Sequence, residues 1–105
     1  MRLSPVERRA VEVASREAFP AGTRVVLFGS RLDDSRAGGD IDLLVELPGP
    51  LPAEELVDRR TRFTARLYRL LDERRIDVVM ADAARPDPRA VVEVARRHGI
   101  ELVRA

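Results

Sequence analysis

Two short hydrophobic runs, Val25–Phe28 and Leu43–Val45, place the strongest constraint on what this chain can fold into. Each run is continuous in aliphatic, β-branched or aromatic residues, which is typical of a strand buried in a sheet. We therefore predict one strand over Arg24–Gly29 and a second over Asp40–Glu46. Buried strands of this kind are packed by helices, and the flanking sequence has helical patterns.

The segment before the first strand, Ser4–Ala18, has the pattern of a helix. Ser4 is predicted to cap it, with Pro5 at the first helical position and Glu7 as the capping-box partner. Pro20, Ala21 and Gly22 end the helix. The apolar residues that recur at helical spacing are Val6, Ala10, Val13 and Ala14.

The rest of the chain continues the alternation of helices and strands. A long helix is predicted over Pro52–Leu71, a strand over Arg75–Ala81, and a helix that starts at Asp87 and Pro88 and stops at Gly99. Ile100–Val103 is predicted to be a short final strand or a tail. This order predicts an α/β (α+β) fold, a small mixed β-sheet flanked by helices, in one domain over residues 1–105. The expected apolar positions are Leu56, Phe63, Leu67 and Leu70 or Leu71 in the long helix, and Ala90, Val91, Val94 and Ala95 in the last one.

Two aspartates stand at the start of the second strand. Asp40 and Asp42 are two residues apart, so they project from one face while Ile41 points to the other. Two carboxylates at the mouth of an apolar strand repel each other unless a cation lies between them. A hard divalent cation such as Mg²⁺ prefers oxygen ligands and suits this pair.

Asp77 has a similar position, one residue into the strand that follows Arg75 and Ile76. If that strand neighbours the second one, Asp77 can complete a site for two metal ions about 4 Å apart. An alternative stays open for each aspartate taken alone, because aspartates at strand starts also face solvent or cap turns.

Gly29 and Ser30 end the first strand. Glycine lets the backbone approach a ligand closely, and a short helix near Ser30–Asp34 would offer N–H groups to a phosphate. Arg31 and Arg36 follow in the loop and either contact the phosphates or are solvated. A Gly-Ser pair after a strand is a weak signal alone, and it matches neither the dinucleotide fingerprint nor the Walker A loop.

Composition removes several classes of function. The chain has no cysteine, which excludes disulfides, thiolate zinc sites and cysteine nucleophiles. All 19 basic residues are arginine, so any phosphate clamp must use arginine. The net charge of +1 argues against broad nucleic-acid binding. The N-terminus lacks the apolar run of a signal peptide, and no stretch approaches the ~20 apolar residues of a membrane span, so we expect a cytoplasmic protein.

The combination of these motifs is more specific than its parts. Phe28-Gly29-Ser30, nine intervening residues and then Asp40-Ile41-Asp42-Leu43 resemble the signature of the DNA polymerase β-like nucleotidyltransferase superfamily. The short length, the Gly29-Ser30-Arg31 start and the later Arg75-Ile76-Asp77-Val78-Val79 make the chain similar to the minimal nucleotidyltransferase (MNT) family, the antitoxin-like partners of HEPN-domain proteins. The nine-residue spacer lies at the short end of the family pattern.

The resemblance implies a role for each motif residue. Gly29 and Ser30, with Arg31 beside them, would bind the triphosphate of the nucleotide. Asp40 and Asp42 would ligate Mg²⁺, with two ions expected. Asp77 would complete the metal site and could accept the proton of the acceptor hydroxyl.

The resemblance also implies a reaction and a partner. Active members of the family transfer AMP from ATP to a tyrosine of the HEPN toxin, which silences its ribonuclease. We therefore expect a Mg²⁺-dependent protein adenylyltransferase (AMPylation) that acts as an antitoxin in a hetero-oligomer. The alternative is a catalytically silent antitoxin that neutralises its partner by binding only. Transfer to a small molecule such as an aminoglycoside is disfavoured, because such enzymes carry an additional domain.

Three other features have structural interpretations. His98, the only histidine, precedes Gly99 and is interpreted as interacting with the dipole of its helix. Tyr68 lies among the apolar-side positions of the long helix and is interpreted as core or rim. The Arg59-Arg60 and Arg96-Arg97 pairs are interpreted as solvated helix faces or partner contacts.

Overall fold

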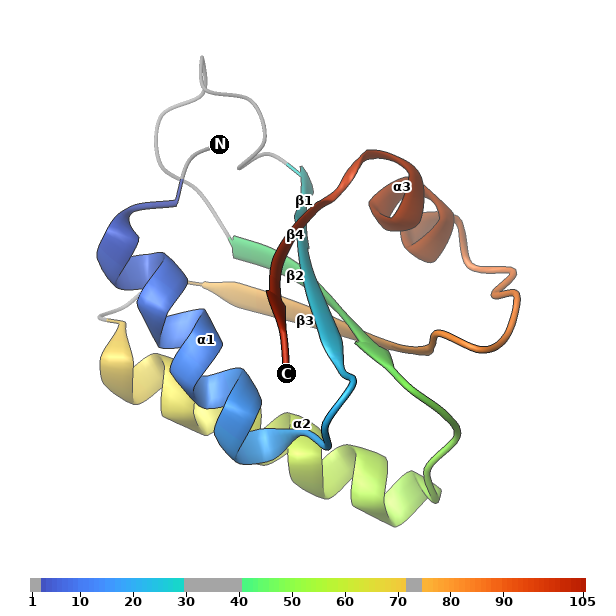
Figure 1. The fold of residues 1–105 in the computed structure, drawn as a ribbon, viewed down its shortest axis with the longest axis horizontal. Helices are drawn as coiled ribbons and strands as arrows, with labels where there is room; N and C mark the ends of the chain where they lie inside the picture. Colours follow the sequence, from blue (N-terminus) through green and yellow to red (C-terminus); the bar gives the residue numbers. More distant parts are fainter. Residues whose placement is uncertain (1–2, 30–40, 72–74) are drawn as a thin grey trace.

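The computed structural model describes residues 3–29, 41–71 and 75–105 (Figure 1). This part of the chain contains three helices and a four-stranded mixed sheet, so the predicted fold class is confirmed. None of these helices is both long enough and apolar enough to cross a bilayer. The elements are α1 (Pro5–Ala18), β1 (Arg24–Phe28), β2 (Ile41–Leu47), α2 (Ala53–Leu70), β3 (Ile76–Asp82), α3 (Ala90–His98) and β4 (Ile100–Arg104).

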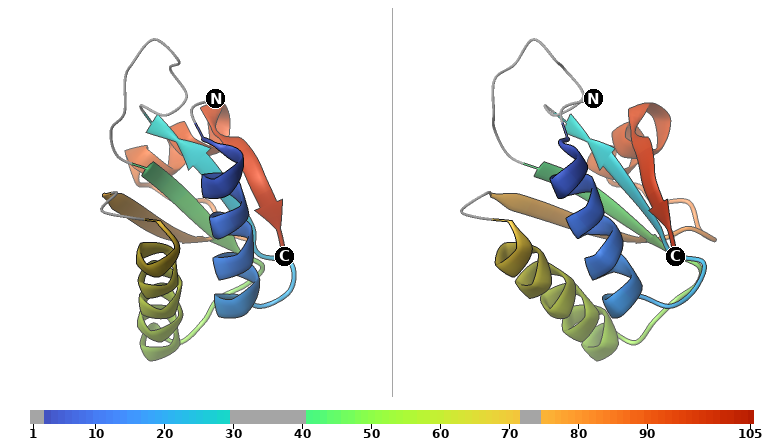
Figure 2. Two further views of the ribbon diagram at one scale, coloured as in Figure 1. Left: turned by 90° about the vertical axis from the view of Figure 1, so that its left-hand side faces the viewer. Right: turned by 60° about the vertical axis from the view of Figure 1, so that its left-hand side comes forward.

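The sheet has the strand order β3-β2-β1-β4. Strand β1 is antiparallel to both β2 and β4, whereas β2 and β3 are parallel, with α2 as the connection between them. The two long helices, α1 and α2, pack side by side on one face, and the short α3 covers the other (Figure 2). The result is a sheet that is covered on both faces.

Strand β2 lies inside the sheet, and its side chains alternate between the two layers. Its odd-numbered residues belong to the core beneath α1 and α2, and each is at most 2% exposed. Leu44 packs instead with Val92 and Ala95 of α3. Because side chains alternate along a strand, Asp42 and Glu46 share the α3 face with Leu44.

Helix α1 begins as the sequence predicts. Ser4 Oγ accepts a hydrogen bond from the Glu7 N–H at 3.1 Å, and Glu7 Oε1 accepts one from the Ser4 N–H at 3.0 Å. The expected apolar stripe is partly wrong, however, because Val6 is 69% exposed and Val11 is fully buried. The helix packs through Val11 and three alanines, whose small side chains allow close approach to the core: Ala10, Ala14 and Ala18.

Helix α3 begins later than expected, at Ala90 instead of Asp87. Asp87 accepts hydrogen bonds from the backbone and the guanidinium of Arg89, and Arg89 also donates to the Met80 carbonyl at 2.6 Å. These bonds hold the segment as a loop against β3. The face that packs on the sheet is formed by Val92 and Ala95, whereas the expected Val91 and Val94 are 40% and 51% exposed.

Gly99 ends α3 as predicted, and the reason for a glycine here is the close packing around it. Its φ of −72° is accessible to any residue, so no left-handed cap requires glycine there. A Cβ atom at Gly99 would instead collide with the Val26 side chain and the Ala95 carbonyl. The glycine therefore allows the turn from α3 into β4 to lie directly on β1.

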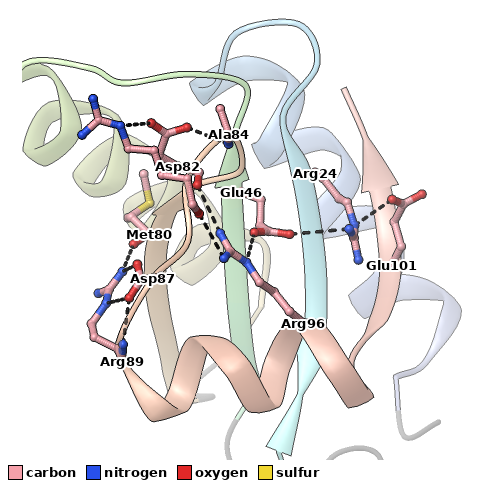
Figure 3. Close-up of polar contacts among 10 residues, drawn as sticks. Arg24, Glu46, Met80, Asp82, Ala84, Asp87, Arg89, Arg96 and Glu101 are labelled. Carbon is pink, nitrogen blue, oxygen red and sulfur yellow. Dashed lines mark hydrogen bonds and ion pairs between the residues drawn. The ribbon is translucent and has the colours of Figure 1, made fainter.

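Glu46 is only 4% exposed and is neutralised by arginines (Figure 3). Its Oε1 lies 2.6 Å from Arg96 Nε, and its Oε2 lies 3.5 Å from Arg24 Nη1. Arg96 also donates to the carbonyls of Asp82 and Arg85 at 3.1 and 3.2 Å. The interpretation of Arg96 as solvated is therefore wrong, because α3 needs this side chain to satisfy a buried carboxylate.

Replacing Arg96 by methionine tests this network. Arg96→Met leaves Glu46 with Arg24 as its remaining ionic partner, so we expect the free energy of unfolding to fall by about 2–4 kcal/mol. The matched control is Arg97→Met, since Arg97 pairs with Glu93 in solvent and both side chains are more than 60% exposed. That change should cost less than about 1 kcal/mol in urea unfolding. Equal losses for the two variants would contradict the structural role of Arg96.

The Asp87 carboxyl provides a pH-dependent test of the loop before α3. The side-chain hydrogen bond from Arg89, followed by the backbone one, lowers the pKa of Asp87 from 3.8 to about 2. A lowered pKa stabilises the fold above pH 3.8, and this contribution disappears as the pH falls through about 2. NMR titration should therefore give a midpoint near 2, and Arg89→Met should move it upward. A wild-type midpoint at 3.8 would show that the Arg89 contacts are absent in solution.

Candidate functional site

Asp42 and Asp77 lie side by side at the N-terminal ends of two neighbouring strands, β2 and β3. Strands β2 and β3 are neighbours, and their parallel register pairs the Cα atoms of Asp42 and Asp77. The sequence analysis required the strand of Asp77 to neighbour the strand of Asp42, and it does. Partners in register on adjacent strands project from the same face. On the other side, Asp42 is paired with Phe28 of β1.

The starts of the two strands are tied together by the backbone. The Ile41 N–H donates to the Arg75 carbonyl at 2.9 Å, directly before the two aspartates. The Asp77 side chain is 49% exposed, and its Oδ1 lies 4.0 Å from Nε of Arg75, which is itself 74% exposed. Asp77 is therefore accessible to a ligand, because an ion pair this open is weak and easily exchanged.

Gly29 adjoins the carboxylate of Asp42. Its φ is +78°, a conformation that side-chain-bearing residues rarely adopt. A Cβ atom built on Gly29 would collide with Oδ2 of Asp42. The absence of a side chain here thus lets the Asp42 carboxylate lie against the end of β1. Sequence reasoning expected Gly29 to approach a phosphate; its contact with Asp42 is an additional requirement for glycine.

Three of the predicted site residues, Ser30, Arg31 and Asp40, lie outside the described residues, as does the short helix expected near Ser30–Asp34. Their roles stay predictions. Within residues 3–29, 41–71 and 75–105, no three histidine, cysteine or acidic side chains form a metal-binding group. Asp42 and Asp77 supply two of the three expected carboxylates, and paired carboxylate oxygens are the donors that Mg²⁺ prefers.

The α3 face of β2 carries an acidic residue near each end, and the two lie in different surroundings. Glu46 is covered by α3 and neutralised by Arg96, whereas Asp42 is half-buried beside the exposed Asp77. A carboxylate that is buried beneath a helix is not accessible to a ligand. The open end of the β2–β3 pair is therefore the candidate site.

Sequence reasoning missed a contact at this site, from Tyr68 of α2. Tyr68 is 45% exposed, so it lies at the rim of the core, one of the two positions expected. Its hydroxyl accepts a hydrogen bond from the Ile76 N–H at 3.2 Å. Ile76 directly precedes Asp77. No local pattern signals this contact, because it links a residue of α2 to the backbone at the start of β3.

A comparison with protein families agrees with this fold and site. A family model described as a nucleotidyltransferase domain matches residues 9–98, which include β1, β2, β3 and both paired aspartates. The chain belongs to the nucleotidyltransferase domain family. Its small α+β architecture is consistent with a nucleotidyltransferase core of the polymerase β-like type. No curated protein matches the chain.

The packing of Gly29 against Asp42 can be tested by adding one methyl group. Gly29→Ala places a Cβ in a left-handed conformation, which costs about 1–2 kcal/mol, and it also displaces the Asp42 carboxylate. Gly49→Ala is the matched control, because a Cβ there meets nothing within 4 Å. We expect thermal unfolding to show a clear loss for Gly29→Ala and a change within about 0.5 kcal/mol for Gly49→Ala. Equal stability of the two variants would refute the described packing.

Proposed function

We propose that this nucleotidyltransferase-domain protein transfers AMP from ATP to a tyrosine hydroxyl of a HEPN-family toxin and thereby acts as its antitoxin. The observation that carries the proposal is the pairing of Asp42 with Asp77 next to Gly29, in a chain whose family match spans both strands. The resemblance of the Gly29-Ser30-Arg31 and Asp40-Ile41-Asp42 motifs to the MNT family supports the choice of acceptor.

The proposed reaction is a nucleotidyl transfer to a hydroxyl. The tyrosine oxygen forms a bond to the α-phosphorus of ATP, and the bond from that phosphorus to the oxygen bridging to the β-phosphate breaks. Pyrophosphate leaves, and the hydroxyl proton passes to the Asp77 carboxylate. Asp77 suits this role because its side chain is 49% exposed and an incoming hydroxyl can reach it.

The other site residues bind and orient the nucleotide. Asp40, Asp42 and Asp77 would hold two Mg²⁺ ions, which neutralise the charge of the triphosphate when bound. Gly29, Ser30 and Arg31 would hold the phosphates at the end of β1. Asp42 has a fixed position in this group, because β2 pairs with a strand on each side and Gly29 leaves room for its carboxylate.

A protein acceptor fits the exposed position of the candidate site. The reacting oxygen must come within about 3–3.5 Å of the phosphorus, in line with the leaving group. In the described residues, the two aspartates lie at the N-terminal ends of β2 and β3, and Asp77 is half exposed on an edge strand. A docked partner can present its tyrosine at such an edge, so we propose that the protein works as a hetero-oligomer.

Asp42→Asn tests whether Asp42 is needed for AMP transfer and not for the stability of the fold. Removing one charge from the Asp42–Asp77 pair relieves repulsion when no metal is present, so the melting temperature in EDTA should equal or exceed that of the wild type. AMP transfer should be abolished. Asp58→Asn, an exposed change on α2 where Asp58 pairs with Arg62, should retain transfer. A large loss of stability for Asp42→Asn in EDTA would show that Asp42 is structural.

Intact-mass spectrometry of a co-purified partner tests the reaction itself. The chain is co-expressed with an adjacent HEPN-type gene, as wild type or as Asp77→Ala, and the partner is weighed. We expect the partner to gain the mass of one or more AMP units only with the wild-type chain. An unmodified partner in both complexes would favour the alternative, an antitoxin that acts by binding alone.

A further inference from the structure

Strand β3 forms an outer edge of the sheet, so every second residue directs its backbone groups away from β2. Three of these outward groups are bound by side chains instead of by another strand. The Tyr68 hydroxyl accepts from the Ile76 N–H at 3.2 Å, Arg60 donates to the Val78 carbonyl at 3.4 Å, and Arg89 donates to the Met80 carbonyl at 2.6 Å. The first of these contacts lies next to the candidate site.

The residues directly before Asp77 are held from both sides. On the inner side, the Arg75 carbonyl accepts from the Ile41 N–H at 2.9 Å. On the outer side, the Ile76 N–H is bound by Tyr68. Ile76 itself is 6% exposed and packs in the core, so the backbone at the start of β3 has a defined position.

Asp77 depends on this backbone for its position. Its side chain is half exposed, and its ion pair with Arg75 spans 4.0 Å in solvent, which gives little orientation. A carboxylate that takes part in catalysis must be held within about 0.5 Å of its productive position. We propose that Tyr68 is a positioning residue for Asp77, whose hydroxyl fixes the start of β3. This inference rests on the proposed function of Asp77.

Tyr68→Phe tests the proposal because it keeps the ring and removes only the acceptor oxygen. For AMP transfer to the co-purified partner, we expect kcat to fall about 3- to 10-fold, the change that corresponds to one lost hydrogen bond, with KM for ATP unchanged. By NMR, the Ile76 amide should exchange faster and the ¹³C signal of the Asp77 carboxyl should move.

The control is Arg89→Met, which removes a similar edge contact from Met80, three residues beyond Asp77. It should leave kcat, the Ile76 amide and the Asp77 signal unchanged, although it can lower stability. An unchanged kcat in Tyr68→Phe, or an equal fall in both variants, overturns the positioning role. If the wild-type chain transfers nothing, the proposed function fails, and NMR alone decides: an unmoved Asp77 signal in Tyr68→Phe then overturns the inference.

Discussion

The parallel pairing of β2 with β3 is the constraint on which the rest of the structure depends. Parallel strands cannot be joined by a tight turn, so the chain between them crosses over as α2, which packs with α1 on one face of the sheet. The same pairing places the N-terminal ends of both strands next to each other. Asp42 and Asp77, which are 35 residues apart in sequence, become neighbours for this reason. The covering of one face of the sheet by α2 and the position of the candidate site thus both follow from one strand pair.

The α3 face of β2 has a structural carboxylate near one end and a carboxylate of the candidate site near the other. Near one end, Arg96 and Arg24 neutralise the buried Glu46 and attach α3 to the sheet. Near the other end, Asp42 lies against Gly29 and beside the exposed Asp77. These two carboxylates on one strand and one face therefore lie in different surroundings: Glu46 is buried beneath α3, whereas Asp42 is half-buried beside the exposed Asp77.

Much of this arrangement could be predicted from local sequence. The capping box of α1 and the buried runs of β1 and β2 depend on neighbouring residues, and these predictions were confirmed. The wrong predictions of apolar helix positions share a physical cause: helical spacing alone does not decide which apolar residues of a helix face the core. Val11 replaces Val6 in α1, and Val92 replaces Val91 in α3, because packing against the sheet selects the face.

By itself, the sequence determined the order of the elements, the class of the fold and the carboxylates and glycine that form the candidate site. Those follow from residue type and short-range spacing, which the chain carries whatever its tertiary structure. Only the tertiary structure decided that Asp42 pairs with Asp77, that Gly29 makes room for a carboxylate, and that Tyr68 binds the backbone before Asp77. These contacts join separate elements, and the register and packing that create them are set by the whole core.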